Sequence, residues 1–421
     1  MPRPLTLLWV VGVFVCFLDY PAVPVGGAVL KVAYLVFPFI FAAVLLQNRL
    51  HVNKKHALLG ALFVGCVMPS VVLSTDVSTS LKFLFGVIVC LAIMGSMYRL
   101  TRAIGLRTVG LLVWVYRITV IVTIPLRISG LQGRGHFTFY EASYWAIALI
   151  PYYCIAFHRL LTGRKRAFIV DGMFIVTAIL ISESVSMVLW VILSFAGVLI
   201  AMKRVRIKYV LAAATVFIVF GVIAYEFNDR AQGIVYTVRN VDGLDSVLSI
   251  AMFIGGNRLQ RVLVAYRAAH DHPLFGVGLG ALKNFTDLHF RAADFSILGN
   301  SADDFDVSMP ATNIFLEMAA ECGIVGLLAF LVLLRFIFKQ CKNKPAVIPF
   351  QVALWITMIS LMIESSYLRP YVWMLYGISL GLSSLATTIP PIPKNKKRGP
   401  RFVWFKSYRS ATKSPALEVG V

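Results

Sequence analysis

The sequence predicts an all-α protein that crosses a lipid bilayer about twelve times. Hydrophobic residues make up 59% of the 421 residues and charged residues only 14%. The apolar residues fall into runs of membrane-spanning length, and the positive residues gather between alternate pairs of runs. A soluble domain carries about 25% charged residues. This chain therefore has too few charges for a water-exposed surface.

Each membrane-spanning helix needs about 20 mostly apolar residues. We predict spans near residues 4–20, 28–47, 57–75, 82–98, 108–126, 142–158, 167–182, 185–202, 209–226, 312–338, 347–366 and 371–389. The seventh and eighth are short because they flank the polar stretch "ISESVSM" (181–187). The first run lacks a small-residue cleavage site, which predicts a retained span rather than a signal peptide.

Basic residues predict the orientation of these spans. The basic segments at 49–55, 99–107, 159–166, 203–208 and 339–344 and the tail 390–421 fall on the same side. Because positive residues concentrate in cytoplasmic loops, both termini are expected in the cytoplasm. The formal charge of +21 then indicates contact with anionic membrane lipid and not with nucleic acid.

The predicted topology divides the chain into four parts. These are spans one to nine (1–226), a long non-cytoplasmic loop (227–311), spans ten to twelve (312–389) and the basic tail (390–421). The loop is far longer than a simple connection. It holds seven Lys or Arg and nine Asp residues, so the positive charge of the chain comes from elsewhere. No internal repeat is evident, which argues against transporters built from inverted repeats.

The long loop contains "GGNRLQRVLVAYRAAHDHPLFGVGLGAL" (255–282). Its first half predicts an amphipathic helix, with Leu259, Leu263 and Tyr266 on one side and Arg258 and Arg261 on another. Pro273 and the glycines Gly276, Gly278 and Gly280 then break the helix. Such glycines let the backbone approach a ligand or a membrane surface closely. Beside arginines, which clamp phosphate, they indicate a phosphate-bearing substrate; a plain surface helix with a tight turn is the alternative.

A second basic cluster, "RISGLQGRGHFTFYEASYWA" (127–146), follows the fifth predicted span. It places Arg127, Arg134, His136 and Glu141 at the external membrane face. Glu141 or Ser143 would cap the helix that follows. Capping alone would explain Glu141, but it does not explain two arginines and a histidine in one short loop.

Arg117 lies near the middle of the fifth predicted span. A charge at that depth costs at least about 2.5 kcal/mol unless it is paired or hydrated, so Arg117 should face the interior of the bundle. Candidate partners are Glu183, Glu317, Glu321 and Glu364. A structural ion pair and a direct catalytic role are both open at this point.

These features together indicate an amphipathic substrate with an anionic polar head and a tail in lipid. The six cysteines show no metal-ligand spacing. Neither a hydride-transfer fingerprint nor a nucleotide-binding loop is present. We therefore expect no metal and no cofactor.

The order of these motifs resembles the O-antigen polymerase and O-antigen ligase superfamily of bacterial cell envelopes. "NRLQRVLVAYRAAHDHPLFGVGLGAL" is similar to the superfamily's arginine, amphipathic helix and P-x-x-G-x-G run. "TNIFLEMAAECGIVG" resembles its H-N-x9-G-x-x-G motif through Asn313, Gly323 and Gly326. "RISG…FYEAS" is similar to the arginine–glycine–E-P-S pattern of many polymerases, and Arg267 with Gly278 fits the R-x10-G spacing of some.

One position departs from the resemblance. Ligases carry a histidine before the asparagine, proposed as the base or as the group that orients the acceptor. This chain carries Thr312 there, and a threonine hydroxyl is not a base near neutral pH. The departure favours a polymerase over a ligase, and it leaves the base unidentified.

The resemblance implies an inverting glycosyl transfer without metal, at the periplasmic face of the inner membrane. Donor and acceptor would both be glycans on undecaprenyl diphosphate, and a chain-length regulator and a flippase would be partners. Arg258 and Arg127, supported by Arg134 and Arg261, would stabilise the departing diphosphate. Glu141 is the first choice of base, before His270 and His272 and then Asp303 or Asp304; the further substrate-binding candidates are Arg267, Asn313 and Arg117. The alternatives are a ligase that transfers polymer to lipid A core and, in another class, a flippase or transporter of lipid-linked glycan.

Overall fold

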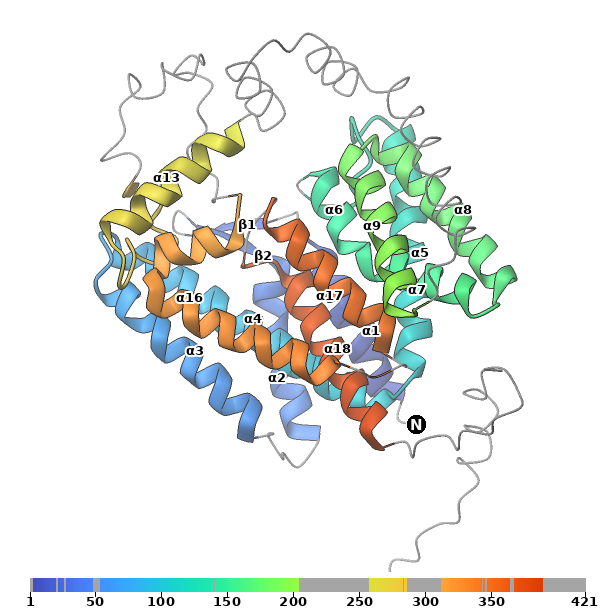
Figure 1. The fold of residues 1–421 in the computed structure, drawn as a ribbon, viewed down its shortest axis with the longest axis horizontal. Coiled ribbons are helices and arrows are strands. Elements are labelled where there is room, and N and C mark those ends of the chain that lie inside the picture. Colours follow the sequence, from blue (N-terminus) through green and yellow to red (C-terminus); the bar gives the residue numbers. More distant parts are fainter. Residues whose placement is uncertain are drawn as a thin grey trace, which may run out of the picture.

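The structure is a computed structural model that describes residues 3–19, 22–25, 28–47, 54–139, 141–203, 257–282, 284–285, 312–342, 344, 347–363 and 367–388. Its elements, in chain order, are α1 (Arg3–Phe17), β1 (Ala22–Val25), β2 (Ala28–Lys31), α2 (Val32–Gln47), α3 (Lys54–Val72), α4 (Val77–Ile104), α5 (Arg107–Ile128), α6 (Ala142–Ala148), α7 (Ile150–Leu161), α8 (Lys165–Ser182), α9 (Val185–Ala201), α13 (Asn257–Asp271), α16 (Ile314–Cys341), α17 (Ile348–Leu361) and α18 (Pro370–Thr388) (Figure 1). The predicted ninth span, most of the predicted long loop, Glu364, Asp303, Asp304 and the basic tail lie outside the described residues.

The helices have the lengths and compositions of membrane spans. Within the described ranges, four of them are long and apolar enough to cross a membrane, namely α3 from Lys55, α4, α5 and α16. The apolar helices α1, α2, α9 and α17 are shorter. These helices support a membrane protein with several spans, and the described residues do not cover all twelve that the sequence predicts.

Among the described residues the chain is helical, as the sequence predicts, apart from one short hairpin at residues 22–31. There β1 and β2 pair as an antiparallel hairpin, with Ala22 opposite Lys31 and Val25 opposite Ala28. The second predicted span begins at residue 28, whereas α2 begins at Val32. "AVPVGGAVLK" places valines on both sides of a Gly-Gly pair, a pattern typical of a tight hairpin.

Two other predicted spans differ in detail. The predicted span 142–158 consists of two helices, α6 and α7, that meet at Leu149. Pro151 lies in the first turn of α7, and proline has no N–H to continue the helical hydrogen bonds from α6. The seventh and eighth predicted spans correspond to the helices α8 and α9, separated where Glu183 ends α8 in a left-handed conformation at φ 49°.

Helices α4 and α18 pack closely together. A side chain at Gly377 would place its Cβ 2.5 Å from the carbonyl oxygen of Met94, and one at Gly381 would lie 2.8 Å from that of Tyr98. Glycine at both positions therefore brings the two backbones into contact. In Figure 1, α3, α13 and α16 lie on one side of this pair, and α5 to α9 lie on the other.

Candidate functional site

The glycine loop, residues 272–280, lies against the first half of α16. Gly276, Gly278 and Gly280 have φ values of 72°, 115° and 72°, which L side chains rarely adopt. A Cβ at Gly276 would overlap the main-chain carbonyl of Glu321, and one at Gly278 would overlap Ser74. We expected these glycines to approach a ligand or a membrane surface. In the structure they approach α16 and the turn between α3 and α4.

The loop docks where α16 is broken. Gly323 has φ 63° and ψ −170°, which divides α16 into two helical halves. Val277 N donates to Ala320 O (2.9 Å) and Ile324 N donates to Pro273 O (2.8 Å). The loop thus supplies partners for main-chain groups near the break, where buried polar groups would otherwise lack them. The two motifs that the sequence shows about 40 residues apart form one packing unit.

A buried carboxylate, Glu321, lies at the centre of this unit. Its Oε2 accepts hydrogen bonds from the hydroxyl of Tyr367 (2.6 Å) and from the amide of Gly280 (2.9 Å). The hydroxyl of Ser70 on α3 donates to its main-chain oxygen at 2.5 Å. The prediction that Glu321 pairs with Arg117 is wrong, because Glu321 binds the glycine loop and the segment before α18.

That segment, Tyr367 to Arg369, leads directly to a buried ionic cluster. Arg369 Nη1 lies 2.5 Å from Asp19 Oδ2, and Lys31 Nζ lies 2.6 Å from Asp19 Oδ1. The guanidinium of Arg369 also stacks over the ring of Tyr144, 3.8 Å from its centroid. Two cations thus face one carboxylate, and the Nε of Arg369 is buried without a hydrogen-bond partner.

The titration of Asp19 follows from these neighbours. Burial by itself would raise the pKa of the Asp19 carboxyl, but Arg369 and then Lys31 outweigh burial and lower that pKa below its usual value. Sequence reasoning missed this cluster. Its three charged residues lie outside the predicted motifs, and Asp19 and Arg369 are 350 positions apart. The available signal was a charge at the end of each of three apolar runs.

The second predicted cluster lies in the loop before α6. Arg127 Nη2 pairs with Glu183 Oε1 at 2.6 Å, and both side chains are more than a third exposed. Arg134 is exposed, while the Nδ1 of His136 is buried without a hydrogen-bond partner. These residues therefore form an open polar surface at the ends of α5 and α8.

Glu141 occupies the N-cap position of α6, as the sequence predicted, but its side chain makes no capping hydrogen bond. Instead it accepts a hydrogen bond from the hydroxyl of Ser143 at 3.0 Å. The side chain is half-buried. Its carboxylate is thus held by one neighbouring hydroxyl and keeps capacity to accept a further proton donor.

On α13, small side chains form the face that packs against α16. Val264, Ala265 and Ala268 are buried against Leu316 and Ala320, whereas Tyr266 is 62% exposed. The side chains of Leu259 and Leu263, which the sequence places on the same side as Tyr266, lie outside the described residues. The amphipathic helix itself is confirmed.

Arg261 lies one turn before Ala265 on this buried face, because residues four apart share a side of a helix. Its Nε is buried and has no hydrogen-bond partner. Arg267 is exposed and pairs loosely with Asp271 at 3.8 Å. His270 and His272 are exposed at the end of the helix. Arg258 lies in α13, and its side chain is outside the described residues.

Asn313 and Arg117 have structural partners. The Oδ1 of Asn313 caps α16 by accepting from the amides of Phe315 (2.9 Å) and Leu316 (3.1 Å). Arg117 binds Asp171 at 2.7 Å, and Arg159 binds the other oxygen of the same carboxylate at 2.7 Å. Among the described residues, the ion-pair partner of Arg117 is thus an aspartate and not a glutamate; Glu364, one of the predicted partners, lies outside them. Asp171 belongs to α8, a neighbour that the order of spans does not reveal.

The two predicted arginine clusters lie apart. In Figure 1, α13 and the glycine loop are on the left of the molecule, and α5, α6 and α8 are on the right. The ionic cluster of Asp19, Lys31 and Arg369 connects them, since Tyr367 reaches Glu321 on one side and Arg369 reaches Tyr144 on the other. Within the described ranges, no three His, Cys, Asp or Glu side chains gather to hold a metal ion.

Residues 172–331 match the family model of O-antigen ligase. The match begins in α8 and ends in α16, so it includes α13, the glycine loop and the break at Gly323. It supports the superfamily of O-antigen polymerases and ligases, a class of membrane enzymes that transfer glycosyl groups, and it fits either branch. The apolar helices and this match agree on a membrane protein of polysaccharide biosynthesis. A search of curated proteins found no match.

A pH-dependent contact holds the glycine loop to α4. Asp76 caps α4 by accepting from the hydroxyl (2.6 Å) and the amide (3.0 Å) of Thr79, and it accepts from Asn284 at 3.0 Å. These hydrogen bonds, those from Thr79 first, lower the pKa of Asp76. Because the pKa of Asp76 is lower in the folded protein than in the unfolded chain, its ionised carboxylate stabilises the fold above the ordinary aspartate pKa near 4. This stabilisation is lost as the pH falls through the folded-state pKa.

We therefore expect Asp76→Asn to lower the melting temperature at pH 7, and the difference from the wild type to shrink as the pH falls below about 4. The measurement is thermal unfolding of both proteins in detergent across pH 3 to 7. A difference that stays constant over this range would refute the role of the ionised carboxylate.

Proposed function

We propose that the protein polymerises oligosaccharide repeat units carried on undecaprenyl diphosphate. The glycan of one lipid-linked unit would pass to a hydroxyl group on the terminal sugar of another, at the periplasmic face of the bacterial inner membrane. The product would be O-antigen, capsule or exopolysaccharide. The match to the family model and the departure at Thr312 support this proposal.

The observation that carries the proposal is the position of Arg261. It lies on the face of α13 that packs against the motif helix α16, and the family match includes all of α13 and α16 as far as residue 331. Its Nε is buried without an acceptor. A buried donor without a partner is costly, and an incoming diphosphate oxygen would supply the missing acceptor. Arg258, one turn earlier on α13, would provide a second guanidinium.

The reaction needs two kinds of help. The bond between the anomeric carbon and the diphosphate oxygen breaks, and both bonding electrons stay with the diphosphate, whose charge the arginines stabilise. A new bond forms between the anomeric carbon and the acceptor oxygen, on the opposite face of the sugar. The acceptor proton passes to a base, which we assign to His270 or His272 at the end of α13, the element that carries Arg261. Glu141, the first choice from the sequence, lies with Arg127 and Arg134 at the other cluster, where the two arginines would bind the acceptor's own diphosphate.

Reconstitution with a lipid-linked repeat unit tests the proposal. The wild type should produce ladders of lengthening glycan without added metal or nucleotide. Removing one preorganised donor to a developing charge costs roughly a hundredfold or more in rate, so Arg261→Ala should almost abolish the ladders. Replacing both His270 and His272 by Gln should abolish transfer while the protein still binds the donor. Arg102→Ala, which removes an exposed arginine near the end of α4, should leave the ladders unchanged.

Normal ladders from Arg261→Ala would refute its role. The printed family description favours one alternative, a ligase. Transfer of preformed polymer to lipid A core, without ladders on the carrier, would establish that alternative. Movement of the lipid-linked glycan across the bilayer without a glycosylated product would establish a transporter.

A further inference from the structure

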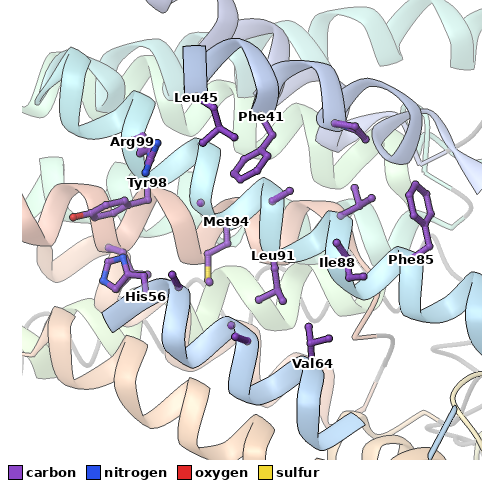
Figure 2. Close-up of a pocket in the computed structure, with 18 of the residues that line it drawn as sticks. Phe41, Leu45, His56, Val64, Phe85, Ile88, Leu91, Met94, Tyr98 and Arg99 are labelled. Carbon is purple, nitrogen blue, oxygen red and sulfur yellow. The ribbon is translucent and has the colours of Figure 1, made fainter. Parts of the chain in front are cut away.

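A groove between α2, α3 and α4 is unrelated to the site above. Its volume is about 740 Å³, and its lining is almost entirely apolar. Figure 2 shows Phe85 at one end and His56, Tyr98 and Arg99 at the other, with Phe41, Ile88 and Leu91 between them. The volume is in the range of sites that bind small molecules.

Small residues keep the groove open. A Cβ at Gly65 of α3 would meet nothing within 4 Å, and those at Gly60 and Gly95 would make only ordinary contacts, at 3.8 Å and 3.7 Å. On α4, Phe85 and Ile88 are 43% and 47% exposed. In a helix long and apolar enough to cross a membrane, such exposed apolar side chains face lipid tails. The groove is therefore accessible from the bilayer.

Polar groups occur only at one end of the groove. Arg99 is half-buried there, and no carboxylate pairs with it among the residues that the structure describes. The ring of His56 contacts Tyr98 edge-on, with centroids 4.7 Å apart. This end is remote from the glycine loop, because α3 ends and α4 begins at the turn that contacts the loop.

The length of the groove matches one leaflet. From Phe85 to Arg99, α4 rises about 21 Å at 1.5 Å per residue, while one hydrocarbon leaflet is about 15 Å thick. An acyl chain that starts at Arg99 would thus stay within the groove through its own leaflet. A guanidinium at the level of the head groups attracts a phosphate.

We propose that this groove binds one acyl chain of an anionic phospholipid, with the lipid phosphate on Arg99. The lipid belongs to the leaflet opposite the glycine loop, so the site is distinct from the one that would hold the substrate's diphosphate. The proposal does not depend on the proposed function. Binding would fill the space between α2, α3 and α4 and stabilise their packing.

The test compares lipids with identical acyl chains and different head groups. The full-length protein in detergent is titrated with phosphatidylglycerol or phosphatidylcholine, with the melting temperature and native mass spectrometry as readouts. Phosphatidylglycerol should bind the wild type more tightly. Arg99→Gln should weaken that binding roughly fivefold, the effect expected for one cation near a lipid surface. Gly65→Leu should reduce the binding of both lipids, and Arg102→Gln should behave as the wild type.

Equal binding of the two lipids by the wild type, or unchanged preference in Arg99→Gln, would overturn the proposal. So would displacement of phosphatidylglycerol by an equimolar isoprenoid monophosphate, which would assign the groove to a prenyl carrier. If Gly65→Leu does not fold, Arg99→Gln decides alone. Arg99→Gln keeps a long polar side chain. If Arg99 had only a structural role, its replacement would not change the preference for phosphatidylglycerol over phosphatidylcholine.

Discussion

Gly276→Ala is expected to destabilise the protein by about 3 kcal/mol or more, and to release the glycine loop from α16. A left-handed conformation costs an alanine about 1–2 kcal/mol. Overpacking adds about 1–3 kcal/mol, and here the new methyl group overlaps the main chain of Glu321, which has no rotamer to move aside. Thermal unfolding in detergent measures the loss, and limited proteolysis between α13 and α16 measures the release.

Gly130→Ala is the matched control. Gly130 has φ 74°, nearly that of Gly276, but a Cβ there would meet nothing within 4 Å. It therefore reports the backbone cost alone, about 1–2 kcal/mol. If both variants lose the same free energy of unfolding, the overlap of the new methyl group with α16 adds no cost at Gly276.

Asp19→Asn should cost about 3–5 kcal/mol, because it leaves the buried Arg369 and the half-buried Lys31 without their counter-charge. The Asp19 side chain is only 1% exposed, and it is within 2.6 Å of both Lys31 and Arg369. The stability contributed by the lowered pKa of Asp19 is present above its ordinary pKa near 4 and lost as the pH falls below it. The difference between wild type and variant should accordingly be largest near neutral pH. Unfolding at several pH values measures it.

Glu183→Gln provides the comparison, since it removes the carboxylate of a pair that is more than a third exposed on both sides. Such pairs contribute about 0–1 kcal/mol. A further variant, Asp19→Asn with Lys31→Met and Arg369→Met, removes all three charges. It should be more stable than Asp19→Asn alone. If it is less stable, the cost of Asp19→Asn does not come from unpaired charge.

The sequence predicted individual elements well where the signal was local. Apolar runs predicted helices at α3, α4, α5 and α16, and the spacing of Asn313, Gly323 and Gly326 predicted one important helix. The helix break itself was not predicted, because glycine is common in membrane helices. Only the loop that docks on Gly323 explains why the helix is interrupted there.

Contacts between distant segments were not predictable in the same way. Arg117 required a partner, but the partner depends on which helices are neighbours, and the order of spans does not contain that information. The same holds for Asp19 and Arg369, which come together only when α1 and α18 pack. Charges at the ends of apolar runs look like ordinary flanking residues until the fold places three of them together.

The docked loop couples the path of α16 to the position of the loop. Val277 N donates to Ala320 O, and Ile324 N donates to Pro273 O. If the loop left α16 while the break kept its shape, these main-chain groups would lose their hydrogen-bond partners. By thermodynamic reciprocity, whatever displaces the loop favours a different α16, and whatever straightens α16 expels the loop. A spectroscopic label in α16 after Gly323 would then report whether the glycine loop is docked on α16.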